Sequence, residues 1–106
     1  MKYLIEYKIR SAGLTYEQNI ANSQALLTAF GKWKPDEGLN VQAFLSKIAG
    51  AGGYVLVETD DTKLIQSFVS KFNFWNDIEV VPVNDVGEAV GIAHAAVNWA
   101  RDAAKG

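Results

Sequence analysis

Two carboxylates, Glu6 and Glu58, have the residue type and setting for acid–base chemistry, because each interrupts an otherwise apolar stretch. A carboxylate turned into an apolar interior has a raised pKa and can act as a general acid or base. Tyr7 adds a phenolic hydroxyl beside Glu6. We therefore take Tyr7, Glu58 and Glu6 as the candidate catalytic residues. The alternative is an outward carboxylate near a strand end, or one paired with Lys8.

Four aromatic residues are candidates for lining a pocket for a flat, apolar ligand: Tyr3, Tyr54, Trp33 and Trp75. The alternative is that they pack in the core and at a dimer interface. Lys32 and Lys34 flank Trp33, an arrangement that could stack a nucleic-acid base. The formal net charge is −2 and basic residues are scattered, so we expect no nucleic-acid partner.

The sequence predicts no metal site and no cofactor. The chain has no cysteine and one histidine, His94, which cannot form a typical zinc site alone. Helical periodicity places His94 on a polar side, which argues against haem ligation. Asp60 and Asp61 offer too few oxygen ligands for a cation and fit helix capping instead. The glycines of residues 50–53 join two strands, whereas phosphate loops lead from a strand into a helix.

The elements that must position these residues follow from periodicity and turn chemistry. Alternation predicts a strand over 2–10 and, more weakly, a second over 41–48. β-branched runs predict strands over 54–59 and 78–83. Helices are expected over 15–31, from a cap at Asp60 or Asp61 to Phe72, and from Asp85 onward. This order predicts an α+β, ferredoxin-like βαββαβ fold with a four-stranded antiparallel sheet and an added C-terminal helix. The 106 residues form one domain, with 1–84 as the core and 85–106 as the helix.

The helices are expected to bury defined stripes. The first helix begins with a capping box, Thr15 and Gln18, and the third with a similar pair, Asp85 and Glu88. The third helix carries a wide apolar face. The inward stripe of the first helix is Tyr16, Ile20, Leu27 and Phe30, and that of the second is Leu64, Ile65, Phe68, Val69 and Phe72.

The sheet is expected to be apolar on both faces. Val55 and Val57 lie on one side of the third strand, and Tyr54 and Leu56 on the other. A soluble monomer rarely exposes such a patch, so the C-terminal helix or a second copy must cover it. We favour a two-fold homodimer, sheet against sheet. Pro82 predicts that the fourth strand lies at an edge or carries a bulge. An edge position agrees with the ferredoxin-like order, in which the first and third strands are central.

Residues 58–61 (Glu-Thr-Asp-Asp), the helix after them and residues 77–83 (Asp-Ile-Glu-Val-Val-Pro-Val) resemble a small bacterial family of domains of unknown function. That family is similar to the dimeric α/β-barrel superfamily. The resemblance covers the chain from the first strand to Val83. It implies a dimer whose two sheets form a barrel. The superfamily includes cofactor-free monooxygenases, isomerases, haem enzymes and proteins without a known reaction, so no catalytic residue is carried over.

These observations favour a cytoplasmic homodimer that binds a small apolar molecule or serves in assembly. The start of the chain lacks a signal peptide's apolar core, and no run approaches the ~18 apolar residues of a membrane helix. No membrane partner is expected. The alternative is a cofactor-independent monooxygenase or isomerase-type tailoring enzyme for an aromatic or apolar metabolite. In that enzyme, Tyr7 and Glu58 would handle protons.

Overall fold

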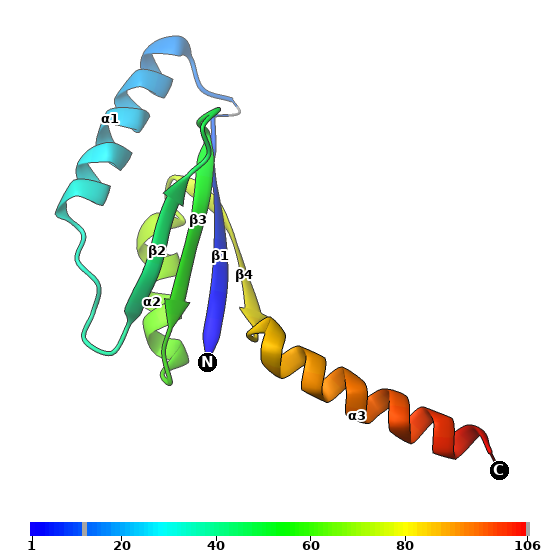
Figure 1. The fold of residues 1–106 in the computed structure, drawn as a ribbon. Helices are drawn as coiled ribbons and strands as arrows, with labels where there is room; N and C mark the ends of the chain where they lie inside the picture. Colours follow the sequence, from blue (N-terminus) through cyan, green and yellow to red (C-terminus); the bar gives the residue numbers. More distant parts are fainter. Residues whose placement is uncertain (12, 106) are drawn as a thin grey trace.

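One antiparallel sheet of four strands organises the molecule (Figure 1). The computed structural model describes residues 1–11 and 13–105. The elements are β1 (Lys2–Ile9), α1 (Tyr16–Lys32), β2 (Asn40–Ser46), β3 (Gly52–Glu58), α2 (Thr62–Phe72), β4 (Asn76–Val83) and α3 (Val86–Ala104). The predicted βαββαβ order with a C-terminal helix is confirmed. The strand order is β2-β3-β1-β4, which is the ferredoxin-like arrangement with β1 and β3 in the centre.

The two edge strands differ in regularity. β4 carries Pro82, which confirms the predicted edge position, since proline cannot donate a backbone hydrogen bond to a neighbour. β2 changes register against β3 between Val41 and Ala43, where Gln42 is the extra residue of a bulge. β2 ends at Ser46, two residues earlier than the predicted strand.

The core lies between the sheet and α1 and α2, which cover the same face (Figure 1). The predicted alternation of β1 and β3 is confirmed, since the two strands contribute Ile5, Tyr7, Val55 and Val57. The predicted stripe of α2 is confirmed as well. Its buried side chains are Ile65, Phe68 and Phe72, and Leu64 and Val69 pack beside them.

The predicted stripe of α1 is wrong except at Phe30. Tyr16, Ile20 and Leu27 are exposed, whereas Leu26 is buried. α1 splays from the sheet, and only its C-terminal half reaches the core (Figure 1). Leu26, Phe30 and Trp33 are spaced four and three residues apart, so they fall on one side of α1. Trp33 follows the end of the helix and packs against Phe68 of α2. Both stripes have helical spacing, and contact with the core selects the second.

The three helix starts differ in how they are capped. Thr15 and Gln18 form the predicted capping box of α1. The Asp61 carboxylate accepts a hydrogen bond from the Lys63 backbone N–H, so Asp61 is the one of the two predicted aspartates that caps α2. Asp85 makes no side-chain cap for α3, so the predicted capping-box pair is absent. Its carboxylate instead accepts a 2.8 Å hydrogen bond from the Lys2 ammonium group.

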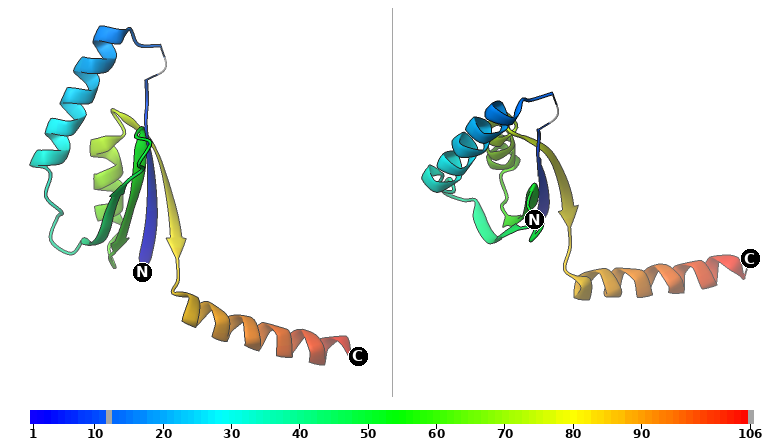
Figure 2. Two further views of the ribbon diagram at one scale, coloured as in Figure 1. Left: turned by 45° about the horizontal axis from the view of Figure 1, so that its top comes forward. Right: turned by 90° about the horizontal axis from the view of Figure 1, so that it is seen from above.

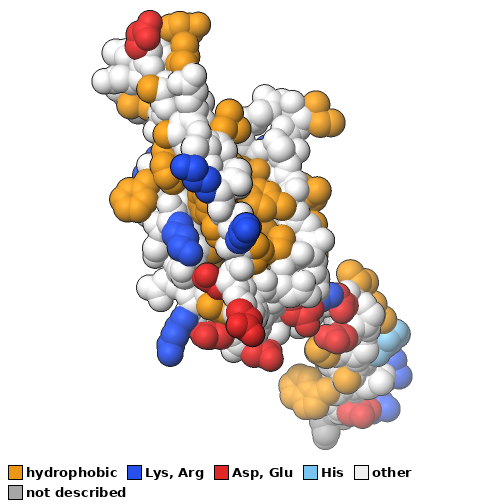
Figure 3. All heavy atoms as spheres, turned by 90° about the vertical axis from the view of Figure 1, so that its left-hand side faces the viewer, with side chains coloured by type: hydrophobic (Ala, Val, Ile, Leu, Met, Phe, Trp, Pro, Cys, Tyr) orange, Lys and Arg blue, Asp and Glu red, His pale blue; other side chains and the backbone are white. Residues whose placement is uncertain are grey.

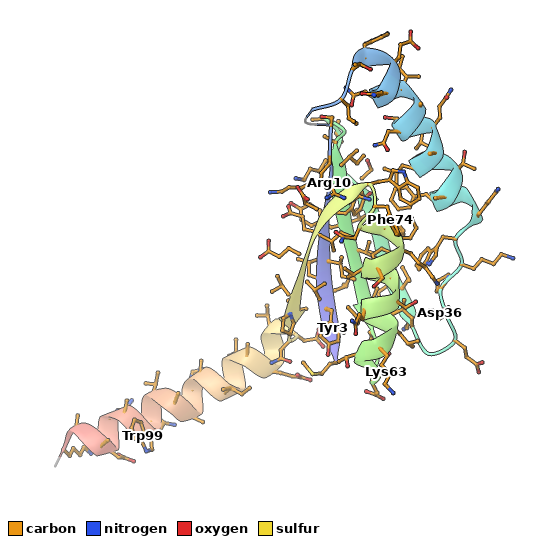
Figure 4. All side chains as sticks on the ribbon, turned by 180° about the vertical axis from the view of Figure 1, so that it is seen from behind. Tyr3, Arg10, Asp36, Lys63, Phe74 and Trp99 are labelled. Carbon is orange, nitrogen blue, oxygen red and sulfur yellow. The ribbon has the colours of Figure 1, made fainter. Side chains whose placement is uncertain are left out.

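α3 leaves the body of the molecule and packs on none of the sheet (Figures 1 and 2). None of its residues is buried, and Trp99 is 73% exposed. Figure 4 shows Trp99 far from the side chains of the other elements. The prediction that this helix buries a wide face is therefore wrong for the single chain. The reason is that the apolar face of α3 and the uncovered face of the sheet do not meet. Among the described residues, no helix is long and apolar enough to cross a bilayer.

Candidate functional site

The sheet face opposite α1 and α2, here called the open face, has an apolar row across all four strands. Val81 in β4 lies beside Leu4 in β1, which lies beside Leu56 in β3, and Leu56 faces Ala43 in β2. Val81 is 42% exposed, and the other three are half-buried by their neighbours. No element of the described chain lies over this row. The open face thus presents the second apolar side that the sequence predicts.

Glu6 lies on the open face in a cluster of charged groups. Its carboxylate is 3.5 Å from the Lys47 ammonium group and 3.9 Å from that of Lys8. Lys47 also lies 5.5 Å from the ring centre of Tyr54, within the range of a cation–π contact. Glu79 is the direct neighbour of Glu6 on β4. The pairing of Glu6 with Lys8 is the structural alternative to a catalytic role, and Lys47 adds a second cation.

Glu58 shares the open face but not the neighbourhood of Glu6. β1 places Glu6 opposite Tyr54 and Lys2 opposite Glu58, so the two carboxylates are four residues apart along the sheet. This corresponds to about 13 Å at the usual rise of a strand. Gln42 donates a 2.8 Å hydrogen bond to the Glu58 carboxylate. The structure therefore does not bring the two glutamates together.

Tyr7 lies on the sheet face that α1 and α2 cover, here called the covered face, and both glutamates lie on the opposite face. Its side chain is in the core, and its hydroxyl donates a 3.1 Å hydrogen bond to the Leu45 carbonyl of β2. The ring reaches β2 by lying across Gly53, where an added Cβ would overlap both the Tyr7 ring and the Leu45 carbonyl. Burial raises the pKa of Tyr7 above its ordinary value, because the phenolate would lose its hydration. Tyr7 is thus held as a neutral hydroxyl at neutral pH.

A hollow of about 350 Å³ opens between α1, β1 and the β2–β3 hairpin, and we call it the α1 hollow. Tyr7, Ile9 and the hairpin residues Gly50 to Gly52 form one side. The other side belongs to α1, which contributes Ser23, Leu26, Leu27 and Phe30. The glycine-rich segment is therefore a hairpin, as predicted, and also a wall of the hollow. Its backbone takes positive φ at Gly50, Ala51 and Gly52.

The four aromatic candidates divide among three places. Tyr54 lies on the open face, and Tyr3 packs against the core, with its hydroxyl 3.8 Å from the Met1 sulfur. Trp33 and Trp75 meet in a second hollow of about 360 Å³, which we call the tryptophan hollow. It lies where α1 and α2 end, and three lysines line it with the indoles. The structure thus brings together two of the four predicted aromatic residues.

Within residues 1–11 and 13–105, no group of three His, Asp or Glu side chains is close enough to hold a metal ion. His94 lies on exposed α3. Asp61 is engaged as the helix cap, and Asp60 lies 3.7 Å from the N-terminal ammonium group.

Sequence reasoning missed residues of both hollows. Leu26 and Ser23 line the α1 hollow. The sequence feature that could have identified them is their helical spacing with Phe30 and Trp33. Lys71 lines the tryptophan hollow with Lys32 and Lys34. No sequence signal links Lys71 to the other two, because α1 and α2 come together only in the fold.

Residues 1–97 match a family described as a domain of unknown function, DUF3303. The chain belongs to this family. The match runs from β1 into α3, so the whole βαββαβ unit and most of the C-terminal helix are features of the DUF3303 domain. No curated protein matches the chain.

Proposed function

We propose that this DUF3303 protein is a cytoplasmic homodimer that binds a small, uncharged, apolar molecule in the α1 hollow. The observation that carries the proposal is the α1 hollow itself. Its volume of about 350 Å³ falls within the usual range for small-molecule sites. Most binding sites of this kind combine apolar walls with a few placed polar groups.

The lining of the α1 hollow selects the class of ligand. Among the described residues, no Lys, Arg, Asp or Glu lines it. Leu26, Leu27, Ile9 and Phe30 supply apolar surface, and Ser23 supplies a hydroxyl from α1. The Tyr7 hydroxyl already donates to Leu45, which leaves its oxygen as an acceptor. A charged ligand would lose hydration here without gaining a partner, so a neutral ligand fits best.

The open face supports the homodimer. Its row of Val81, Leu4, Leu56 and Ala43 crosses the full width of the sheet and is uncovered in the single chain. Continuous apolar surface of this kind marks an interaction site in soluble proteins. A two-fold pairing buries one copy's row against the other's. This arrangement agrees with the dimeric barrel that the sequence resemblance implies.

The ligand half of the proposal is tested with phenylnaphthylamine, an uncharged probe whose fluorescence rises in apolar surroundings. Ser23→Trp fills the α1 hollow and should weaken probe binding at least tenfold. Gln24→Trp adds the same side chain at the next position, which is exposed and does not line the hollow. It should leave binding unchanged. Equal binding by the two variants would overturn the proposed site.

The dimer half is tested by analytical ultracentrifugation. Leu56→Lys places a charge in the middle of the apolar row and should convert the dimer to a folded monomer. Gln66→Lys, at an exposed position of α2, adds the same charge elsewhere and should leave the dimer intact. A wild-type protein that sediments as a monomer would contradict the dimer and leave the probe experiment unaffected.

A cofactor-independent enzyme is the second candidate, and the place of Tyr7 at the wall of the hollow favours it. Proton transfer would then rest on Tyr7 alone, since Glu6 and Glu58 lie on the opposite face of the sheet. Any compound that co-purifies with the protein can be incubated with wild type and with Tyr7→Phe. Conversion by both proteins would remove Tyr7 from the reaction.

A further inference from the structure

The tryptophan hollow has a rigid aromatic floor. Trp33 packs edge-on against Phe68, with ring centres 5.2 Å apart, and against Phe72 at 6.0 Å. The ring centre of Trp75 lies 6.3 Å from that of Phe72. Phe68 and Phe72 are each 3% exposed, so the core fixes both indoles. The two indoles are half-buried, and their remaining surface faces the hollow.

Three lysines from separate segments line the same hollow. Lys32 ends α1, Lys34 follows in the next loop, and Lys71 lies in the last turn of α2. Figure 3 shows basic side chains beside exposed apolar surface on this side of the molecule. Asp36 is 3.8 Å from Lys71, and both side chains are close to half exposed. Among the described residues, no carboxylate lies within 4.0 Å of Lys32 or Lys34.

The charges do not cancel. Lys32 and Lys71 lie at helix C-termini, and each helix end carries a partial negative charge of about one half. Those two partial charges and Asp36 offset about two of the three lysine charges. The hollow therefore keeps an excess of about one positive charge in a chain whose formal net charge is −2. Compensation of the helix ends does not account for Lys34, which lies outside both helices.

We propose that the tryptophan hollow binds a planar aromatic anion. The ring system would pack on the indoles of Trp33 and Trp75, and the carboxylate, sulfonate or phosphate would pair with Lys32, Lys34 and Lys71. A volume of about 360 Å³ admits a molecule of two or three fused or linked rings. The site is independent of the α1 hollow, because the two hollows share no lining residue. One admits neutral ligands, and the other selects anions.

The test uses two probes that differ by one charged group: anilinonaphthalene sulfonate and uncharged phenylnaphthylamine. The lysine variants are measured in a Trp99→Phe background, so that Trp33 and Trp75 are the tryptophans that transfer excitation energy to a bound probe. Changing Lys32, Lys34 and Lys71 together to Gln should raise the dissociation constant of the sulfonate at least tenfold. The same change should leave binding of the uncharged probe unaltered. Replacing the three lysines by Arg should retain sulfonate binding, since the charge is kept.

The matched control changes Lys8, Lys63 and Lys105 to Gln, which removes the same total charge at exposed positions outside the hollow. Equal loss of sulfonate affinity in the control and the test variant would overturn the proposal, because only overall charge would then matter. Loss of sulfonate binding on Ser23→Trp would overturn it in another way, by assigning that probe to the α1 hollow. Circular dichroism shows whether each variant keeps its fold.

Discussion

α2 and α3 are both amphipathic, yet only α2 packs on the sheet. α2 has 11 residues and buries Ile65, Phe68 and Phe72. α3 has 19 residues and buries none. The difference lies in how each is connected. α2 joins β3 to β4, so strands hold it at both ends and it must cross the sheet, whereas within the described residues α3 is joined to a strand only at its start. An apolar stripe shows that a helix has a face to cover, but the chain connections decide what covers it.

The largest effect should come from truncating matched aromatic residues on the two helices. Phe68→Ala should lower the free energy of unfolding by about 3–5 kcal/mol, because it leaves a cavity in the core. Trp99→Ala should change the unfolding of the monomer by less than about 0.5 kcal/mol, since this side chain is exposed. Urea unfolding of the monomeric Leu56→Lys background gives both values. A large loss from Trp99→Ala would mean that α3 packs on its own chain.

A second contrast concerns two asparagines, Asn76 just after α2 and Asn98 within α3. Asn76 is fully buried, and its amide nitrogen donates a 2.9 Å hydrogen bond to the Phe72 carbonyl at the end of α2. Asn76→Asp replaces that donor by a buried carboxylate and should cost about 3 kcal/mol at pH 7. Asn98→Asp on exposed α3 should cost almost nothing. Thermal unfolding of the two variants tests the difference, and equal melting temperatures would contradict it.

The stability of the protein should depend on pH through Tyr7 on the covered face, but not through the Lys2–Asp85 pair at the start of α3. Burial raises the pKa of Tyr7 in the folded state, whereas the unfolded tyrosine ionises near pH 10. The stability that this group contributes is fully present below pH 10 and is lost as the pH rises through its folded pKa. Tyr7→Phe should make the unfolding free energy less steep above pH 10. Denaturant unfolding from pH 9 to 11 measures this slope, and identical slopes would exclude Tyr7 as its source.

Lys2, which pairs with Asp85 at the start of α3, is the residue compared with Tyr7. Its hydrogen bond with the Asp85 carboxylate raises the pKa of its ammonium group. The pair is solvent-exposed, so we expect no resolvable contribution from it to stability in the same pH range.

The smallest expected difference in stability is between replacing the N-cap residue of α2 and replacing that of α3. Asp61→Ala removes the side-chain cap of α2 and should cost about 1 kcal/mol. Asp85→Ala removes only the exposed pair with Lys2 and should cost clearly less than the loss of the α2 cap. Chemical denaturation at neutral pH measures both. Equal losses would show that Asp85 supports α3 more than its contacts indicate.

The sequence predicts the sheet well because strand alternation is a local property. The pattern from Tyr3 to Ile9 predicts which side chains face the core, and the structure agrees. Pro82 likewise indicates an edge strand, because proline has no backbone N–H to donate to a neighbouring strand, and β4 lies at an edge. The two hollows could not be predicted, since each joins elements that are distant in the chain. The sequence suggests one pocket for Trp33, Trp75 and two tyrosines, and only the fold separates the tyrosines from it and adds Lys71.

The predictions for α1 and α3 failed for a different reason. α1 offers two apolar stripes of similar spacing, and contact with the core selects the one that contains Leu26. α3 offers a clear stripe but has no contact on its own chain. The candidate catalytic residues show a related limit. Tyr7 and Glu6 are adjacent in β1, so they must point to opposite faces of the sheet, and Glu58 lies at a distance set by register.

The two edge strands of the sheet have a consequence for how the protein behaves at high concentration. A regular edge strand is a template on which other chains add as further strands, which leads to fibres and precipitates. Here Pro82 interrupts the β4 edge, and the bulge at Gln42 interrupts the β2 edge. Both edge strands therefore disfavour the addition of a further strand from another chain. Crowding should therefore yield discrete, reversible assemblies through the flat surfaces rather than amyloid-like polymers.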